Sequence, residues 1–137
     1  MTILYVDDDS DDRQLFIESV KAIDEHFICV VARDGLEALE YLEKNDLPDV
    51  VFLDINMPLM DGKKCLAEIR RNKKTSALPV IIFTTSNDPG ERGECEVLGA
   101  SDFVRKPVSY LDMAAILASI FRSSKFIFEV MRKDKAT

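Results

Sequence analysis

The stretch "TILYVDDDSDD" (residues 2–12) places five aspartates between positions 7 and 12, directly behind an apolar run. The run 2–6 is typical of a buried strand. A helical pattern begins soon after it, with Asp9 or Ser10 available as the N-cap. Adjacent carboxylates repel each other, so folding alone gives no reason to collect them. Either they lie apart in water, or something positive holds them together.

The same order of apolar run and helical pattern repeats along the chain. Strands are predicted at 2–6, 27–32, 49–54, 79–85 and 101–106, and helices at 10–24, 35–45, 62–73, 89–98 and 108–121. The strands are continuous apolar runs, which is typical of strands buried on both faces. Strict alternation of strands and helices therefore predicts an α/β fold, with an open parallel sheet covered by helices on each side.

Composition limits the classes of function. The 137 residues are 47% hydrophobic and 31% charged, which indicates one soluble domain. A net charge of -7 argues against binding to nucleic acid or to anionic membranes through a basic face. The sequence shows neither a membrane span of roughly 20 apolar residues nor a signal peptide. The three cysteines are widely spaced without a CxxC pair, which predicts reduced thiols and a cytoplasmic protein.

Functional groups follow the predicted strands at their carboxyl ends. Asp7 and Asp8 follow the first strand, Asp54 ends the third, Thr84 lies in the last residues of the fourth, and Lys106 ends the fifth. In open parallel sheets, ligands bind beyond this edge, near the point where the strand order reverses. We therefore expect carboxylates, a hydroxyl and an ammonium group to converge there.

This set of groups suits phosphoryl transfer. Carboxylates at close range need a compensating cation, and Mg²⁺ in proteins binds carboxylates, water and phosphate oxygens. One carboxylate could then attack phosphorus, while Lys106 and Thr84 stabilise the transferring group. The product would be an acyl phosphate, which is reactive enough to make the modification reversible.

Four separated segments carry a resemblance. "VDDD" (6–9), "LDINMPLMDG" (53–62), "TTS" (84–86) and "GASDFVRKP" (99–107) resemble, in order and spacing, the signatures of bacterial response regulator receiver domains. The similarity covers residues 2 to about 121. It implies a flavodoxin-like sheet in the order 2-1-3-4-5 with five helices on both faces. We expect a receiver domain over residues 1–122 and a C-terminal tail over 123–137.

The resemblance also implies the roles of the acidic residues. Asp54 would accept a phosphoryl group from a sensor histidine kinase or a phosphotransfer protein. Asp7 and Asp8 would bind Mg²⁺ together with Asp54 and the backbone carbonyl of Asn56. The remaining acids of the first segment are expected in the cap and first turn of the first helix, where the helix dipole favours negative charge: Asp9, Asp11 and Asp12.

The resemblance implies two further catalytic residues, Thr84 and Lys106, and a switch made of Thr84 and Phe103. Thr84 would supply the switch hydroxyl, and Lys106 would contact the phosphoryl group. The peptide bond between Lys106 and Pro107 is commonly cis in the family. Phe103 stands where many members have tyrosine. Because Phe103 has no hydroxyl, its coupling to Thr84 would depend on packing.

We expect a stand-alone signalling switch that catalyses only its own phosphorylation and dephosphorylation, and not an enzyme with an external substrate. The segments "SDDRQLF" (10–16) and "TTSNDPGERGE" (84–94) resemble small regulators of the phytochrome-associated type. A downstream protein target would bind the face made by the fourth helix, fifth strand and fifth helix. The tail carries apolar residues that would extend the last helix, fold back on the domain or form a homodimer contact: Phe126, Ile127, Phe128, Val130 and Met131.

Two other functions fit part of the pattern. A pseudo-receiver would keep the fold and act as a binding module without taking up phosphate, but such proteins normally lose the acceptor, the lysine or an acid. A hydrolase of the haloacid-dehalogenase type would use a DxD pair such as Asp7 and Asp9. The second and third signatures fit receivers better, and no cap segment is evident.

Overall fold

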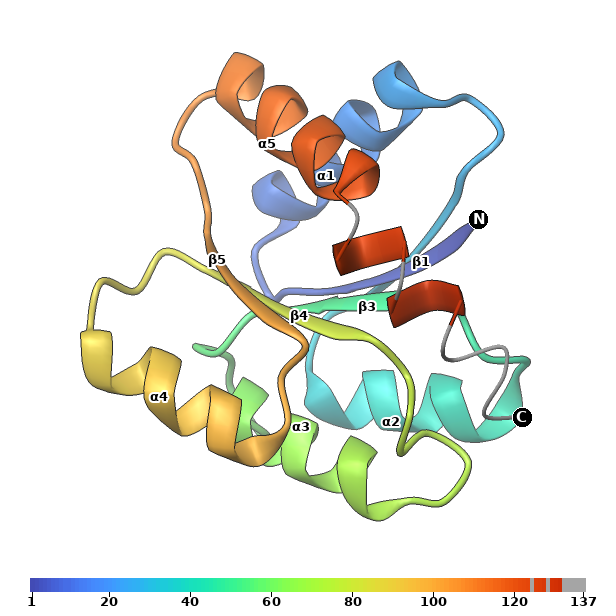
Figure 1. Cartoon of the computed structure of the whole chain (residues 1–137), viewed down its shortest axis with the longest axis vertical. Coiled ribbons are helices and arrows are strands. Elements are labelled where there is room, and N and C mark those ends of the chain that lie inside the picture. The colour runs from blue at the N-terminus through green and yellow to red at the C-terminus, as the bar shows by residue number, and fades with distance from the viewer. Residues whose placement is uncertain (124, 128, 132–137) are drawn as a thin grey trace.

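The structure is a computed structural model that describes residues 1–123, 125–127 and 129–131. Strands and helices alternate strictly along it, as the apolar pattern predicts (Figure 1). The elements are β1 (Thr2–Val6), α1 (Ser10–Ile23), β2 (Ile28–Ala32), α2 (Gly35–Lys44), β3 (Val50–Leu53), α3 (Gly62–Arg71), β4 (Val80–Thr84), α4 (Pro89–Leu98), β5 (Asp102–Arg105) and α5 (Tyr110–Arg122). Among the described residues, no helix combines the length and apolar composition that crossing a membrane requires.

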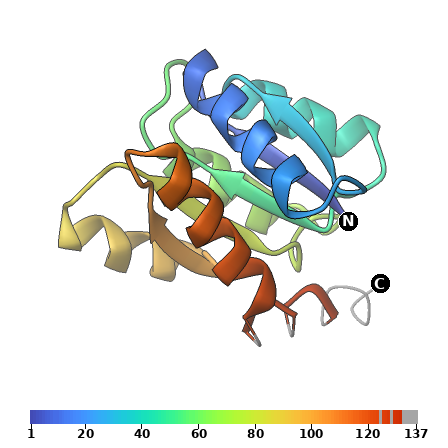
Figure 2. The ribbon, with the colours of Figure 1, turned by 90° about the horizontal axis from the view of Figure 1, so that it is seen from above.

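The five strands form one parallel sheet in the order β2-β1-β3-β4-β5, which confirms the predicted fold class. Helices α1 and α5 cover one face, and α2, α3 and α4 cover the other (Figures 1 and 2). Strand β1 has β2 on one side and β3 on the other, so the chain order reverses there. The carboxyl ends of β1 and β3 therefore form the edge at which a ligand site is expected.

Alternate side chains of each buried strand enter two separate apolar layers, because successive residues of a strand point to opposite faces. In β1, Ile3 and Tyr5 pack in the layer under α1 and α5, whereas Leu4 and Val6 pack in the layer over α2, α3 and α4. All four side chains are fully buried. Continuous apolar strands thus give the sheet two cores, one on each face.

The beginning of α1 is set by Asp9, whose carboxylate accepts hydrogen bonds from the backbone N–H groups of Asp11 and Asp12. Asp9, and not Ser10, is therefore the N-cap. A side-chain oxygen at this position satisfies N–H groups that have no partner within the helix. The aspartates of this run therefore have different roles, because Asp9 caps α1 whereas Asp7 lies at the end of β1.

The C-terminal tail folds back on the domain over its described residues. Helix α5 ends at Arg122, and the Ser123 hydroxyl accepts a hydrogen bond from the Phe126 N–H at 3.0 Å. The Phe126 side chain is 8% exposed and contacts the Phe121 ring with a centroid distance of 5.5 Å. Ile127 and Met131 are exposed, and Phe128 lies outside the described residues. A dimer contact of the tail stays a prediction.

We predict that Phe126→Ala lowers the free energy of unfolding by about 3 kcal/mol, because it empties a buried position against an aromatic neighbour. Ile127→Ala is the matched control, since the neighbouring Ile127 side chain is 48% exposed. It should change stability by less than about 0.5 kcal/mol. Urea denaturation measures both values. Equal stability of the two variants would show that the tail does not pack on the domain in solution.

The start of α3 lies close against the end of β3. The Gly62 N–H donates to the carbonyl of Ile55 at 2.8 Å. A Cβ atom at Gly62 would lie 2.1 Å from the carbonyl oxygen of Asp54 and 2.7 Å from the Cα of Ile55. Both are backbone atoms, which cannot turn away as a side chain could. A glycine is therefore required here by close approach.

We predict that Gly62→Ala destabilises the fold by at least about 1–3 kcal/mol, the usual cost of overpacking. Gly93→Ala in α4 is the matched control, because a Cβ there meets nothing within 4 Å. Its stability should be unchanged or up to about 1 kcal/mol higher, since alanine is the better helix former. Thermal unfolding of the two variants compares them directly, and a neutral Gly62→Ala would contradict this packing.

Candidate functional site

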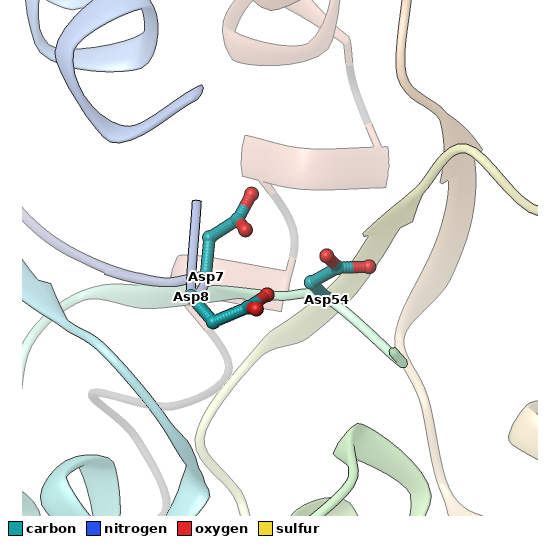
Figure 3. Close-up of side chains that lie close together, drawn as sticks. All are labelled: Asp7, Asp8 and Asp54. Carbon is teal, nitrogen blue, oxygen red and sulfur yellow. The ribbon is translucent and has the colours of Figure 1, made fainter. Parts of the chain in front are cut away.

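The carboxyl ends of β1 and β3 bring three predicted site residues together. Beyond the paired strand residues, the Asp7 N–H donates to the Ala32 carbonyl and the Asp54 N–H donates to the Val6 carbonyl, both at 3.0 Å. These bonds continue the parallel ladders and hold Asp54 beside the end of β1. One carboxylate oxygen each of Asp7, Asp8 and Asp54 lies within 4.8 Å of the others (Figure 3).

Asp7 is fully buried, and its carboxylate is surrounded by donors. Its Oδ2 accepts hydrogen bonds from the Tyr5 hydroxyl at 2.7 Å and from the Lys106 ammonium at 2.5 Å, and its Oδ1 accepts one from the Asp9 N–H at 3.0 Å. Burial and the neighbouring charge of Asp7 raise the pKa of Tyr5 above its ordinary value. The phenol therefore stays protonated and acts as a donor.

Lys106 reaches the acids from the end of the edge strand β5. Its backbone N–H donates to the Thr84 carbonyl at 2.7 Å, which fixes it just past the end of β5. The side chain is 4% exposed, and its Nζ lies 2.5 Å from Asp7 Oδ2, 3.1 Å from Asp12 Oδ2 and 3.2 Å from Asp54 Oδ2. The lysine thus contacts carboxylates from β1, α1 and β3.

The neighbouring charges shift the pKa of the ammonium. Burial lowers the pKa of Lys106, but the hydrogen bond to Asp7 and the charges of Asp54 and Asp7 outweigh burial and raise the pKa above its ordinary value. Lys106 therefore stays charged although its side chain is buried.

Asp54 is 7% exposed and has a raised pKa. Burial is the largest cause, and the charge of Asp7 adds to it. The charge of Lys106 and the Thr84 hydroxyl lower the pKa and partly offset burial. One carboxylate oxygen accepts a hydrogen bond from the Ile55 N–H at 2.8 Å and the other faces Lys106. Asp54 is thus a nearly buried carboxylate in contact with an ammonium that it shares with Asp7 and Asp12.

The remaining predicted residues lie around this group. Thr84 is fully buried at the end of β4, and its hydroxyl accepts a hydrogen bond from the Ser86 N–H at 3.3 Å. Asn56 is exposed, two residues beyond Asp54 in the β3–α3 loop. The expectation of a cis Lys106–Pro107 bond is wrong for this structure, in which the described residues contain no cis peptide bond. The trans form is the lower in energy for most prolyl bonds, by about 0.5–1 kcal/mol.

Phe103 lies away from the acids, on β5 beside α4. It is half-buried in the apolar layer over α2, α3 and α4. The Arg92 guanidinium of α4 lies 5.8 Å from the centre of its ring, within the range of a cation–π contact. Phe103 therefore links the strand that precedes Lys106 to the outer face of α4.

Two residues of the site, Tyr5 and Asp12, are not among those that the sequence patterns predict for it. Tyr5 lies in an apolar run, but residues two apart on a strand share a face, which puts its hydroxyl beside Asp7. The sequence pattern places Asp12 only in the first turn of a helix. Its contact with Lys106 joins residues 94 positions apart, and no local pattern indicates it.

The acidic residues suit a hard divalent cation. Three carboxylates, those of Asp7, Asp12 and Asp54, contact the ammonium of Lys106, and the Asp8 carboxylate lies beside those of Asp7 and Asp54. The acidic side chains of this group therefore outnumber the ammonium that they surround. Oxygen ligands with excess negative charge are typical of Mg²⁺ and related ions.

Comparisons with known proteins agree with this geometry. The family model described as response regulator receiver domain matches residues 3–120. A protein-glutamate methylesterase/protein-glutamine glutaminase of Rhodospirillum rubrum is 39% identical over 109 residues, which is 78% of this chain and 28% of that protein. The chain spans less than half of the length of the first curated relatives it matches.

Two solved structures are similar over most of the chain. The Mn²⁺-bound form of response regulator Rcp1 matches with a TM-score of 0.79 and 29% identity, covering 87% of this chain and 90% of that one. The phosphorylated cyanobacterial phytochrome response regulator RcpA matches with a TM-score of 0.82 and 27% identity, covering 87% and 89%. With its family match, its sheet order and its acidic strand ends, the chain belongs to the response regulator receiver domain family.

Proposed function

We propose that this protein is a cytoplasmic response regulator whose receiver domain accepts a phosphoryl group on Asp54 with Mg²⁺ and thereby switches a protein-interaction surface. The donor would be a sensor histidine kinase or a phosphotransfer protein. The observation that carries the proposal is the position of Lys106, whose Nζ contacts both Asp7 of the β1 end and Asp54 of the β3 end. That arrangement places positive charge at the carboxylate that would be modified.

The transfer step follows from these groups. An oxygen of the Asp54 carboxylate attacks phosphorus, the bond from phosphorus to the donor nitrogen or oxygen breaks, and a bond from Asp54 to phosphorus forms. Lys106 balances negative charge on the transferring group, and the Thr84 hydroxyl turns to donate to one of its oxygens. Later attack by water on phosphorus returns Asp54 to its free carboxylate and releases inorganic phosphate.

We assign the metal site to Asp7, Asp8 and Asp54, with the backbone carbonyl of Asn56 as a further ligand. The mutual distances of the three carboxylates within 4.8 Å support this assignment, as does the Mn²⁺-bound form of the similar protein Rcp1. A divalent cation held by these carboxylates would supply positive charge that, together with Lys106, offsets the negative charge of the transferring group. Asp8 is exposed and therefore the acid most open to an entering ion.

We assign the output to the face of α4, β5 and α5. Several large apolar side chains are exposed on it or beside it: Val97, Val108, Tyr110 and Leu111. Contiguous exposed apolar surface commonly marks interaction sites. Phe103 lies on β5, and Lys106 follows the end of that strand. A rearrangement of Lys106 and Thr84 would therefore change the conformation of this face through Phe103. A downstream protein or a second copy of the chain would bind it.

We predict that incubation with acetyl phosphate and Mg²⁺ adds the mass of one phosphoryl group to the protein, measured on the intact chain. Asp54→Asn should gain no mass, and a chelator should abolish the gain. Asp46→Asn is the matched control, because Asp46 is an exposed aspartate outside the site and should label normally. If a known receiver is labelled in parallel and this chain is not, the binding-module function replaces this proposal.

We predict that Mg²⁺ stabilises the unphosphorylated protein. At a free concentration of about ten times Kd, the free energy of unfolding should rise by about 1.4 kcal/mol. Asp8→Asn should remove most of this increase, whereas Glu18→Gln, an exposed acid far along α1, should keep it. Thermal unfolding with and without Mg²⁺ measures both. A rise that survives Asp8→Asn would exclude Asp8 as a ligand.

A further inference from the structure

The contact between Asp12 and Lys106 is not explained by helix capping. The Asp12 Oδ2 lies 3.1 Å from the Lys106 Nζ, whereas its backbone N–H already donates to the Asp9 carboxylate. A charge placed only for the helix dipole would point to solvent. The Asp12 side chain instead reaches across to the exit of β5 and is 35% exposed.

All the donor capacity of Lys106 is used in this structure. A lysine ammonium has three N–H donors. Asp7, Asp12 and Asp54 each accept one of them, at 2.5, 3.1 and 3.2 Å. An incoming phosphoryl oxygen can therefore bind the ammonium only if one carboxylate gives up its place.

Asp12 is the carboxylate that can leave at the lowest cost. Asp7 is fully buried, lies nearest to Lys106 and is also held by the Tyr5 hydroxyl. Asp54 is the group that would be modified and is nearly buried. Only Asp12 has a side chain with substantial exposure, so water can solvate it after release. Breaking a partly exposed ion pair also costs less free energy than breaking a buried one.

We propose that Asp12 is a positioning residue that holds the Lys106 ammonium while Asp54 is unmodified and yields it to the phosphoryl group during transfer. The contact stabilises the unphosphorylated site and must break before Lys106 can serve the transferring group. Asp12 thereby slows phosphorylation and sets the balance between the two forms. The kinetic consequence rests on the proposed function, whereas the contact itself does not.

The first measurement tests the contact without metal or phosphoryl donor. The ¹⁵N signal of the Lys106 ammonium and the exchange of its protons with water are compared by NMR in wild type, Asp12→Asn and Asp11→Asn. Asp11→Asn removes the same charge from the same helical turn, and Asp11 is exposed. We expect a shifted signal and severalfold faster exchange in Asp12→Asn only. Wild-type behaviour in Asp12→Asn would overturn the proposal.

The second measurement is the rate of Asp54 labelling by acetyl phosphate at saturating Mg²⁺. Asp12→Asn should be labelled about two to five times faster than wild type, which is the size expected for loss of one partly exposed ion pair. Asp11→Asn should match wild type. An altered Lys106 signal with equal labelling rates would overturn the positioning role. An altered signal with no labelling of any variant would refute the proposed function and leave the Asp12–Lys106 contact established.

Discussion

The Lys106 ammonium contacts three carboxylates, those of Asp7, Asp12 and Asp54, and these contacts hold the site together. One carboxylate oxygen each of Asp7, Asp8 and Asp54 lies within 4.8 Å of the others. Two unit charges at about that distance repel each other by roughly 3.5 kcal/mol at an effective dielectric constant of about 20. Contacts of 2.5–3.2 Å from one cation to three of the acids offset that repulsion. Burial and the charge of Asp7 raise the pKa of Asp54, and the charge of Lys106 partly offsets that rise. One ammonium shared among three carboxylates leaves an excess of acidic groups at this edge, which suits a divalent cation.

The parallel sheet supplies the positions that this interaction needs. Backbone bonds beyond the strand ends hold Asp54 next to β1 and Lys106 next to β4. Tyr5 connects the site to the core, because its ring stacks on Phe16 at 4.0 Å while its hydroxyl donates to Asp7. Tyr5 thus holds the Asp7 carboxylate from the side of the core. Asp8 is exposed and the Asp12 side chain is partly exposed, so these two acids of the site meet solvent.

Most of the fold could be predicted, because each local pattern agrees with its neighbours. The apolar runs gave the strands to within two residues, and the alternation with helices gave the parallel sheet. The sequence could not distinguish Asp9 from Ser10 as the N-cap of α1, since both residue types cap helices and only the backbone geometry separates them. The packing of the C-terminal tail could not be predicted either. Its apolar residues fit a core or an interface equally well until the bend at Ser123 turns Phe126 toward Phe121.

Sequence patterns are enough to predict which chemical groups stand at the strand ends. The carboxyl ends of parallel strands meet at one edge of the sheet, and these residues follow those ends: Asp7, Asp8, Asp54, Thr84 and Lys106. The sequence patterns do not determine how one ammonium is shared among the carboxylates. That sharing depends on distances between residues 52, 94 and 99 positions apart, and on which carboxylate is buried. That Asp12, in the first turn of α1, is the third partner of Lys106 is visible only in the folded protein, because no local sequence pattern indicates a contact between side chains of distant elements.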